Sequence, residues 1–356
     1  MTHNWTENLD ALIEQNRCFA LYRIPQNNYA HLLLSGNEPP QQLCRIDALN
    51  HQSGFVMAPF QVSKSCPVVL FHPRSSEQIP LPPGDTSPHT DEYPFRPAAI
   101  EAAYAKRFRT FMDALREERF RKLVLSRKAT IRRSKNFSPA QTFLRACRYS
   151  ARSYAYLFHS PPTGTWLGCT PELLLAGEKN QFRTVALAGT QTLKPGPAPV
   201  DWDDKNLAEQ MLVARYVHAQ LATLGIRPDE DGPYTIEAGR LAHLQTDFRF
   251  SFPEAGKLGD LLRLLHPTPA VSGLPKEEAC RFIPEHEGYN RRYYSGFAGW
   301  IDAAGRTDLY VNLRCMYIQR RCITLYAGGG LLPSSLPEKE WQETENKLQT
   351  MLSILS

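Results

Sequence analysis

Short runs of apolar residues, each bounded by polar or turn-forming residues, recur along the chain and predict β-strands. Two such runs, "CFALYRI" and "HLLLSG", lie near the N-terminus. The remaining predicted strands are "KLVLSRKATI", "SYAYLFH", "FRTVALAG", "YSGFAGWID", "DLYVNLRCMYI" and "RCITLYAGGG". Because the strands are mixed with single helices and show no fixed period, the pattern predicts a layered α/β or α+β protein and not a repeat array.

Helices are predicted between these strands. They cover Ala98 to about Phe120, a segment that opens at Ser138-Pro139, about 203–224 and about 337–353. Ser138 suits the N-cap, where its hydroxyl accepts a backbone hydrogen bond, and Pro139 suits the first helical position. Pro337 opens the last helix in the same way.

A proline-rich stretch separates the two parts of the chain. The segment from about Phe71 to Pro97 is rich in proline and polar residues, which predicts an irregular connection. It divides the N-terminal residues 1–97, including the connection itself, from residues 98–356, where the patterns are sharper.

The composition indicates a globular chain with a sizeable core, since 42% of its 356 residues are hydrophobic and 22% are charged. No run approaches the roughly 18 to 20 apolar residues of a membrane span, and the N-terminal residues lack the apolar segment of a signal peptide. The eight cysteines show neither a C-x-x-C pair nor zinc-finger spacing, so we expect reduced thiols and a cytoplasmic location. A net charge of +5 with dispersed arginines argues against nucleic-acid binding.

Glu172 is a candidate acid because it follows Pro171 in "GCTPELLL", at the edge of an apolar strand. It could be an ordinary loop glutamate with an arginine partner. A carboxyl pressed against apolar residues would instead have a raised pKa, which suits a general acid.

Two predicted helices carry further acidic residues. Glu340 and Glu343 share one face of the last helix with Lys347, and Glu209 follows Lys205 by four residues in the 203–224 helix. Both sets are compatible with solvated helix surfaces that carry i,i+4 ion pairs. With the "AGGG" glycines, whose backbone N–H groups could approach an anion, they are also compatible with a Mg²⁺ site beside an anionic substrate.

Taken in order, these motifs resemble the chorismate-utilising enzymes, which include isochorismate synthases, salicylate synthases, anthranilate synthase component I and aminodeoxychorismate synthase component I. The matching segments, between about Lys122 and Leu352, are "KLVLSR", "GCTPELLL", "LAGT", "K...E" at 205–209, "HLQT", "HPTPAVSGLP", "YSGFAGW", "VNLR", "AGGG" and "EWQETENK". The resemblance implies one large α/β (α+β) domain in which two β-sheets pack face to face, with helices outside and the proline-rich connection internal.

The resemblance also implies an isomerisation of chorismate to isochorismate. In that reaction water adds at C2, the double bonds shift and the C4 hydroxyl leaves. By similarity, Lys122 is the base that activates the water, and Glu172 is the acid that protonates the departing hydroxyl. Without the family match, Lys122 would be interpreted as a structural residue at a strand start.

Both carboxylates of chorismate are expected to meet positive charge. By similarity, Mg²⁺ held by Glu209 and Glu343, with Glu340 direct or through water and Lys347 nearby, meets the ring carboxylate. The enolpyruvyl carboxylate is expected at Arg314 and Tyr294, supported by backbone N–H groups near Gly328 and Gly330. The expected lining also includes Gly189, Thr190 and His243, of which His243 could equally be a core histidine.

The uncharged loop "HPTPAVSGLP" is similar to the isochorismate synthase branch of the family. Ala270 and Val271 are expected to form the wall beside C2 and to leave room for one water. The alternatives are a salicylate synthase, which also eliminates pyruvate, and an ammonia-using synthase component. We expect a monomer or weak dimer with no obligatory amidotransferase partner.

The sequence departs from the family pattern in three places. Asn206 and Gln210 stand where an acidic residue and a histidine are common, "TQTLKPG" replaces an arginine-containing segment, and Asn290 replaces an acidic residue before Arg291. These changes put local packing and charge in doubt more than the reaction. Isochorismate supplies menaquinone, catechol siderophores and salicylate, of which menaquinone is expected first on breadth of occurrence alone.

Overall fold

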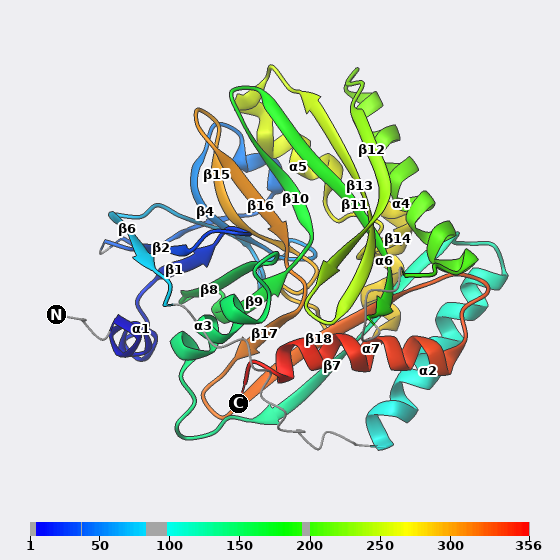
Figure 1. Ribbon diagram of the computed structural model, residues 1–356, viewed down its shortest axis with the longest axis horizontal. Helices are drawn as coiled ribbons and strands as arrows, with labels where there is room; N and C mark the ends of the chain where they lie inside the picture. The colour runs from blue at the N-terminus through cyan, green and yellow to red at the C-terminus, as the bar shows by residue number, and fades with distance from the viewer. Residues whose placement is uncertain (1–4, 37, 83–97, 194–199, 356) are drawn as a thin grey trace.

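The strands are divided between two nine-stranded antiparallel sheets in the computed structural model, which describes residues 5–36, 38–82, 98–193 and 200–355 (Figure 1). Sheet A has the order β14, β7, β18, β17, β9, β8, β1, β2, β6. Its strands are β14 (Gly273–Leu274), β7 (Lys122–Arg132), β18 (Cys322–Leu331), β17 (Cys315–Ile318), β9 (Gly164–Thr170), β8 (Tyr154–Ser160), β1 (Phe19–Arg23), β2 (Tyr29–Leu34) and β6 (Ser75–Pro80).

Sheet B has the order β12, β13, β11, β10, β16, β15, β4, β5, β3. Its strands are β12 (Asp229–Ala238), β13 (Leu241–Ser251), β11 (Gln181–Thr192), β10 (Leu173–Glu178), β16 (Thr307–Val311), β15 (Phe297–Asp302), β4 (Ser53–Ala58), β5 (Val68–Phe71) and β3 (Gln41–Leu43). Strands from residues 1–97 enter both sheets, so the N-terminal part is integral to the same domain.

A buried aromatic layer joins the inner faces of the two sheets. Tyr154 of β8 stacks on Tyr310 of β16 with ring centroids 4.2 Å apart, and Phe158 of β8 lies 5.1 Å from Phe55 of β4. Offset or stacked aromatic pairs of this kind add to the free energy gained by burying their area. The predicted face-to-face packing of the sheets is therefore confirmed.

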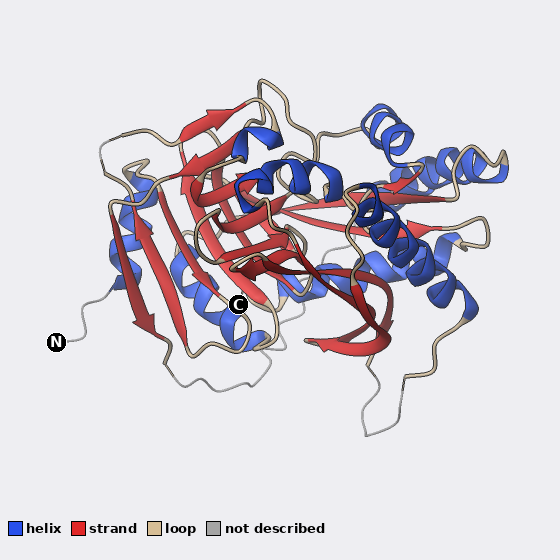
Figure 2. Cartoon of the chain, turned by 90° about the horizontal axis from the view of Figure 1, so that it is seen from above, coloured by secondary structure: helices blue, strands red, loops and turns tan. Residues whose placement is uncertain are grey.

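Helices flank the sheets on their outer sides (Figure 2). They are α1 (Trp5–Glu14), α2 (Ala98–Arg116), α3 (Pro139–Tyr149), α4 (Asp204–Thr223), α5 (Leu258–Leu265), α6 (Lys276–His286) and α7 (Pro337–Leu352), with short 3-10 turns η1 (Ile46–Leu49) and η2 (Ala255–Lys257). Helices α4 and α5 pack on sheet B, and α2 and α6 pack near β7. Among the helices that the structure describes, none is long and apolar enough to span a membrane.

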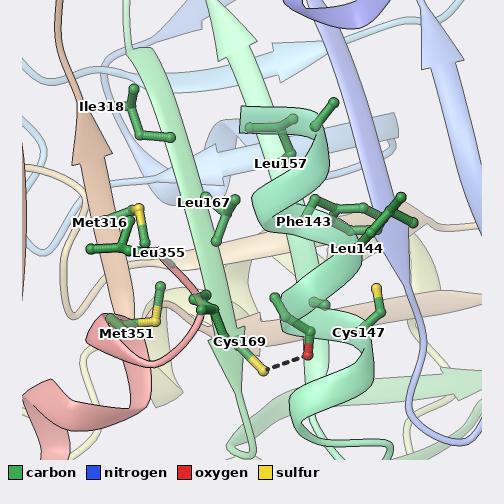
Figure 3. Close-up of a cluster of buried hydrophobic side chains, with 14 of the residues drawn as sticks. Phe143, Leu144, Cys147, Leu157, Leu167, Cys169, Met316, Ile318, Met351 and Leu355 are labelled. Atoms are coloured by element: carbon green, nitrogen blue, oxygen red, sulfur yellow. Dashed lines mark hydrogen bonds between the residues drawn. The ribbon is translucent and has the colours of Figure 1, made fainter. Parts of the chain in front are cut away.

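Apolar side chains of α3 and α7 close the outer face of sheet A. Figure 3 shows Phe143 of α3 and Met351 of α7 directed toward Leu157, Leu167 and neighbouring residues of β8, β9 and β17. All eight cysteines of the chain are free thiols, as their scattered spacing predicts. This packing fixes α7, the helix that carries Glu340 and Glu343, against the sheet.

The predicted helix starts at Ala98, Ser138-Pro139 and Pro337 are confirmed, and Ser138 accepts the N–H of Gln141 as an N-cap should. The first of these helices ends at Arg116, short of the predicted Phe120. The predicted irregular connection was partly wrong, because its residues Ser75–Pro80 form β6 and pair with β2 at the edge of sheet A. Prolines are tolerated at such an edge. Residues 83–97 of that connection lie outside the described residues.

One apolar run, "DLYVNLRCMYI", is two strands and not one. Its first half is β16 in sheet B and its second half is β17 in sheet A. The chain crosses between the sheets at Asn312–Arg314, where Arg314 has a positive φ of 45°. This crossover places Arg314 between the two sheets, where the candidate site lies.

Candidate active site

A pocket between the sheets brings together most of the predicted site residues. The predicted residues that line it are Glu172, Gly189, Thr190, Glu209, His243, Ala270, Val271, Tyr294, Arg314, Gly328, Gly330, Glu343 and Lys347. Two further predicted residues do not line the pocket but contact residues next to it. Lys122 contacts Glu209, and Glu340 contacts Lys205. The pocket is also lined by residues that were not predicted individually, of which all but Tyr326 lie inside the quoted motifs: Val124, Pro171, Leu187, Ala188, Leu313, Tyr326 and Ala327.

Lys122 is the first residue of β7 and is fully buried. Its Nζ lies 2.9 Å from Oε1 of Glu209 on α4. Burial opposes the ionisation of Glu209, but Lys122 and Lys205 outweigh it and hold the pKa of Glu209 below its ordinary value. The base candidate and one metal-ligand candidate are therefore a buried ion pair.

Glu172 occupies the turn between β9 and β10 and is 2% exposed. Burial raises its pKa to about 7, although Lys122, the Thr268 hydroxyl and Arg314 act in the opposite direction. The Thr268 hydroxyl, in the 266–275 loop, lies 3.4 Å from Oε1 of Glu172. A carboxyl with this pKa holds a proton near neutral pH, which is what a general acid requires.

A second acidic group lies where α4 and α7 meet. Lys205 Nζ lies 2.9 Å from Glu340 Oε1 and 3.8 Å from Glu209 Oε2. Burial, and then repulsion from Glu343, raise the pKa of Glu340 to about 7. Lys205 was considered from the sequence only as an i,i+4 partner of Glu209, so its bridge to α7 was missed.

This acidic group offers oxygen ligands but is not a preformed metal cage. Among the described residues, no three His, Cys, Asp or Glu side chains are arranged to hold a metal ion. Oε2 of Glu340 is nevertheless buried and has no hydrogen-bond partner there, while Oε1 of Glu343 is held by Lys347 at 2.6 Å. A buried carboxylate oxygen without a partner is costly, and a hard cation is the partner that oxygen ligands suit.

Arg314 and His243 contact each other in the lining of the pocket. Arg314 Nη2 lies 3.1 Å from His243 Nε2, and His243 Nδ1 lies 3.0 Å from the Gly189 carbonyl. Burial and then Arg314 hold the pKa of His243 well below its ordinary value. A neutral ring that accepts from Arg314 must carry its proton on Nδ1 and donate to Gly189. His243 thus orients Arg314 in the pocket.

Glycines 328 and 330 belong to strand β18, which confirms the strand predicted at "RCITLYAGGG". A Cβ on Gly330 would lie 2.0 Å from Glu209 Oε1, and one on Gly328 would lie 2.9 Å from the Tyr294 hydroxyl. The Gly328 carbonyl accepts from Lys347 Nζ at 2.8 Å, so this residue points its backbone groups away from β7. Because strand residues repeat that direction at every second position, the N–H groups of both glycines are directed away from β7 as well.

Asn206 and Gln210, two of the departures from the family pattern, make hydrogen bonds that hold helix α4 in place. The side-chain oxygen of Asn206 accepts the N–H of Thr190 at 3.1 Å, and Gln210 Nε2 donates to the Ala186 carbonyl at 3.0 Å. Both amides therefore hold α4 against β11. These bonds keep Glu209 at the pocket.

The two sheets thus surround a pocket lined by a protonatable glutamate and an arginine, with a buried lysine next to it. The chain belongs to the family described as "Chorismate binding enzyme", whose sequence model matches residues 85–356. The family resemblance of the motifs is confirmed. The roles of the individual residues stay predictions.

Its relatives include isochorismate synthases. Isochorismate synthase EntC of Escherichia coli K12 is 34% identical over 214 residues, which cover 56% of this chain and 54% of that protein. Isochorismate synthase MenF of the same strain is 31% identical over 66% of this chain and 56% of its own length. Isochorismate synthase DhbC of Bacillus subtilis is 26% identical over 94% and 84%. The chain thus spans little more than half the length of the first two proteins.

Solved structures confirm the predicted fold. The crystal structure of DhbC from Bacillus anthracis has a TM-score of 0.83 at 24% identity, and the match covers 98% of this chain and 99% of that chain. Anthranilate synthase component I of Streptococcus pneumoniae has a TM-score of 0.69 at 18% identity, with coverage of 94% and 90%. At these identities the likeness concerns the fold alone.

Proposed function

We propose that the protein is an isochorismate synthase, which isomerises chorismate to isochorismate in a Mg²⁺-dependent reaction. The observation that carries the proposal is that Glu172, a buried glutamate whose pKa of about 7 keeps a proton available, lines the same pocket as Glu209, which contacts the buried Lys122 at 2.9 Å. The names of EntC, MenF and DhbC support the same reaction.

The residues divide the reaction between them. Lys122 in its neutral form, once it has given up the proton of its ion pair with Glu209, accepts a proton from the water that attacks C2, and Glu172 donates a proton to the C4 hydroxyl as it leaves. Arg314, oriented by His243, binds the enolpyruvyl carboxylate with Tyr294 and the backbone of Gly328 and Gly330. Ala270 and Val271 bound the space for the attacking water without offering it a polar partner.

Mg²⁺ would be held by Glu209, Glu340 and Glu343, with Lys347 beside them. The ion would neutralise the ring carboxylate of chorismate and withdraw electron density from the ring. The partnerless Oε2 of Glu340 supports this assignment. Lys205 forms ion pairs with Glu340 and Glu209. When Mg²⁺ binds, one or both of these ion pairs would have to lengthen.

The direct test is to incubate the purified chain alone with chorismate and Mg²⁺ and to identify the products by NMR. Isochorismate without pyruvate is the expected result. Stoichiometric pyruvate with salicylate would instead make the protein a salicylate synthase. An aminated product that requires ammonium salts would place it among the ammonia-using components.

The pathway is a finer proposal. The similar solved structures include one protein described as menaquinone-specific and one described as 2,3-dihydroxybenzoate-specific, and we propose menaquinone supply on its breadth of occurrence. Deleting the gene and measuring menaquinone and catechol siderophores tests this. Loss of siderophore with normal menaquinone would contradict it. A cytoplasmic location stays a prediction.

A further inference from the structure

A buried arginine, Arg291, joins the 266–275 loop to strand β7. Its Nη1 donates to the Val271 carbonyl at 2.7 Å, and its Nη2 donates to the Val124 carbonyl at 2.8 Å. Val271 and Val124 both line the pocket, whereas Arg291 lies behind them and is 3% exposed. One guanidinium therefore fixes two walls of the site relative to each other.

Glu287 holds this guanidinium in place. Its carboxylate accepts from Arg291 Nε and Nη2, each at 2.7 Å. The same carboxylate accepts from the backbone N–H and the hydroxyl of Ser126 on β7, both at 2.7 Å. The guanidinium of Arg291 also stacks over the ring of Phe60, with its Cζ 4.5 Å from the ring centroid. Short, charge-assisted bonds in a buried network favour one geometry over its alternatives.

The loop that Arg291 holds also connects the acid to the base. Near its start, the Thr268 hydroxyl lies 3.4 Å from the Glu172 carboxylate. Near its end, Leu274 pairs with Lys122 in the β14–β7 ladder. The Val271 carbonyl, which accepts from Arg291, lies between Thr268 and Leu274 in the sequence. Displacement of the loop would therefore move Glu172 relative to Lys122.

We propose that the Arg291–Glu287 pair is a positioning element that sets the geometry between the general base and the general acid. This inference rests on the proposed function, in which Lys122 and Glu172 perform proton transfer on opposite parts of one ring. Arg291 touches neither substrate nor reacting atoms, so its effect acts through the loop and β7. Misplacement of catalytic groups by about 1 Å can cost on the order of 100-fold in rate.

The test is Arg291→Lys, which keeps the charge opposite Glu287 but cannot reach all of its acceptors at once. We expect kcat to fall about 10- to 100-fold while KM for chorismate changes less than about threefold. Arg291→Met should lower kcat further than Arg291→Lys does, because the lysine keeps a positive charge opposite Glu287. An unchanged kcat in a folded Arg291→Lys protein would overturn the proposal.

Arg23→Lys is the matched control. Arg23 is also buried, at 2% exposure, and donates to the carbonyls of Cys147, Ser150 and Ser153, away from the pocket. We expect it to lower the melting temperature as Arg291→Lys does but to leave kcat unchanged. An equal fall of kcat in both variants would reduce Arg291 to a structural role and overturn the proposal.

If Arg291→Lys fails to fold, Ser126→Ala is the deciding variant, because it removes one hydrogen bond to Glu287 and one to the Tyr289 hydroxyl while it keeps Arg291. A measurable fall in kcat with normal folding supports positioning, and an unchanged kcat overturns it. Product identification on the wild type tests the proposed function separately. If the wild type forms another product from chorismate, the positioning role is tested in the same way, by comparing the kcat of Arg291→Lys with that of the wild type for that product.

Discussion

Lys122 Nζ lies 2.9 Å from Glu209 Oε1, and the lysine side chain has no exposure to solvent. The same carboxylate lies 3.8 Å from Lys205, which also pairs with Glu340. The proposed base is therefore paired with a member of the acidic group proposed to bind the metal. Any side chain at Gly330 would separate them, because its Cβ would lie 2.0 Å from Glu209 Oε1.

Lys122→Met should lower the rate of isochorismate formation about 100- to 10,000-fold, the usual contribution of general acid–base catalysis. The protein should stay folded, because Glu209 keeps Lys205 as a cationic partner. Lys128→Met, an exposed position on the same strand, is the control and should keep full activity. Steady-state assays and thermal melts check both variants. A normal rate in Lys122→Met would mean that another group activates the water.

Glu172 should make the reaction depend on pH. Because the acid works in its protonated form and burial raises its pKa to about 7, kcat should fall as the pH rises through about 7. Glu172→Gln should remove activity at every pH, whereas Glu178→Gln, exposed at the end of β10, should not. A pH–rate profile of the three proteins provides the check. An unaltered profile in Glu172→Gln would contradict the assignment.

The same pKa shift predicts an effect on stability. The folded state binds the Glu172 proton more tightly than the unfolded chain, whose pKa is near 4.5. The contribution of this group is therefore most favourable below about pH 4.5 and is lost as the pH rises through about 7. Urea unfolding should show Glu172→Gln to be more stable than wild type at pH 8, by up to about 3 kcal/mol, but not at pH 4.5. Equal gains at both pH values would contradict this.

Mg²⁺ should bind without substrate, and more tightly as the pH rises. Because burial and then Glu343 raise the pKa of Glu340 to about 7, this carboxyl is protonated at lower pH and must lose its proton to bind the ion. Calorimetric titration with MgCl₂ at pH 6 and pH 8 measures the change. Glu340→Gln should weaken binding at both, and the exposed Glu338→Gln should not. Full turnover in excess chelator would remove the metal assignment.

Ala270→Thr tests the wall beside the proposed site of water attack. Thr adds a methyl and a hydroxyl next to the pocket, and a change of this size alters local interactions by about 1 to 3 kcal/mol. Partition between isochorismate and pyruvate should then shift about 10- to 100-fold toward pyruvate. A time course of isochorismate and pyruvate formation by the wild type and by Ala270→Thr measures this shift. Identical product ratios would show that this wall does not control the outcome.

Much of the fold follows from local patterns. Short apolar runs bounded by polar or turn-forming residues, such as 122–131, predict strands, and Ser138 caps its helix through a hydrogen bond to a nearby backbone N–H. The division of 308–318 between two sheets was not predictable from periodicity. Both halves are apolar, and the break at Arg314 depends on how the sheets pack.

The candidate site was predictable only through the ordered motifs. Residue types and spacing left Glu172 and the acids of α7 open to ordinary structural explanations. Lys205 was within a recognised motif, but its bond to Glu340 spans 135 positions of sequence and arises only when α4 meets α7. The Arg291–Glu287 pair carries a visible i,i+4 signal, whereas its grip on Val271 and Val124 depends on tertiary packing.

The central claim is that water, activated at Lys122, adds to C2 of chorismate while the C4 hydroxyl leaves. The most direct measurement is to run the purified protein with chorismate and Mg²⁺ in ¹⁸O-enriched water and to locate the label by mass spectrometry and NMR. The account predicts isochorismate with one solvent oxygen, in the C2 hydroxyl. Isochorismate without label, formed by transfer of the substrate's own hydroxyl, would contradict it.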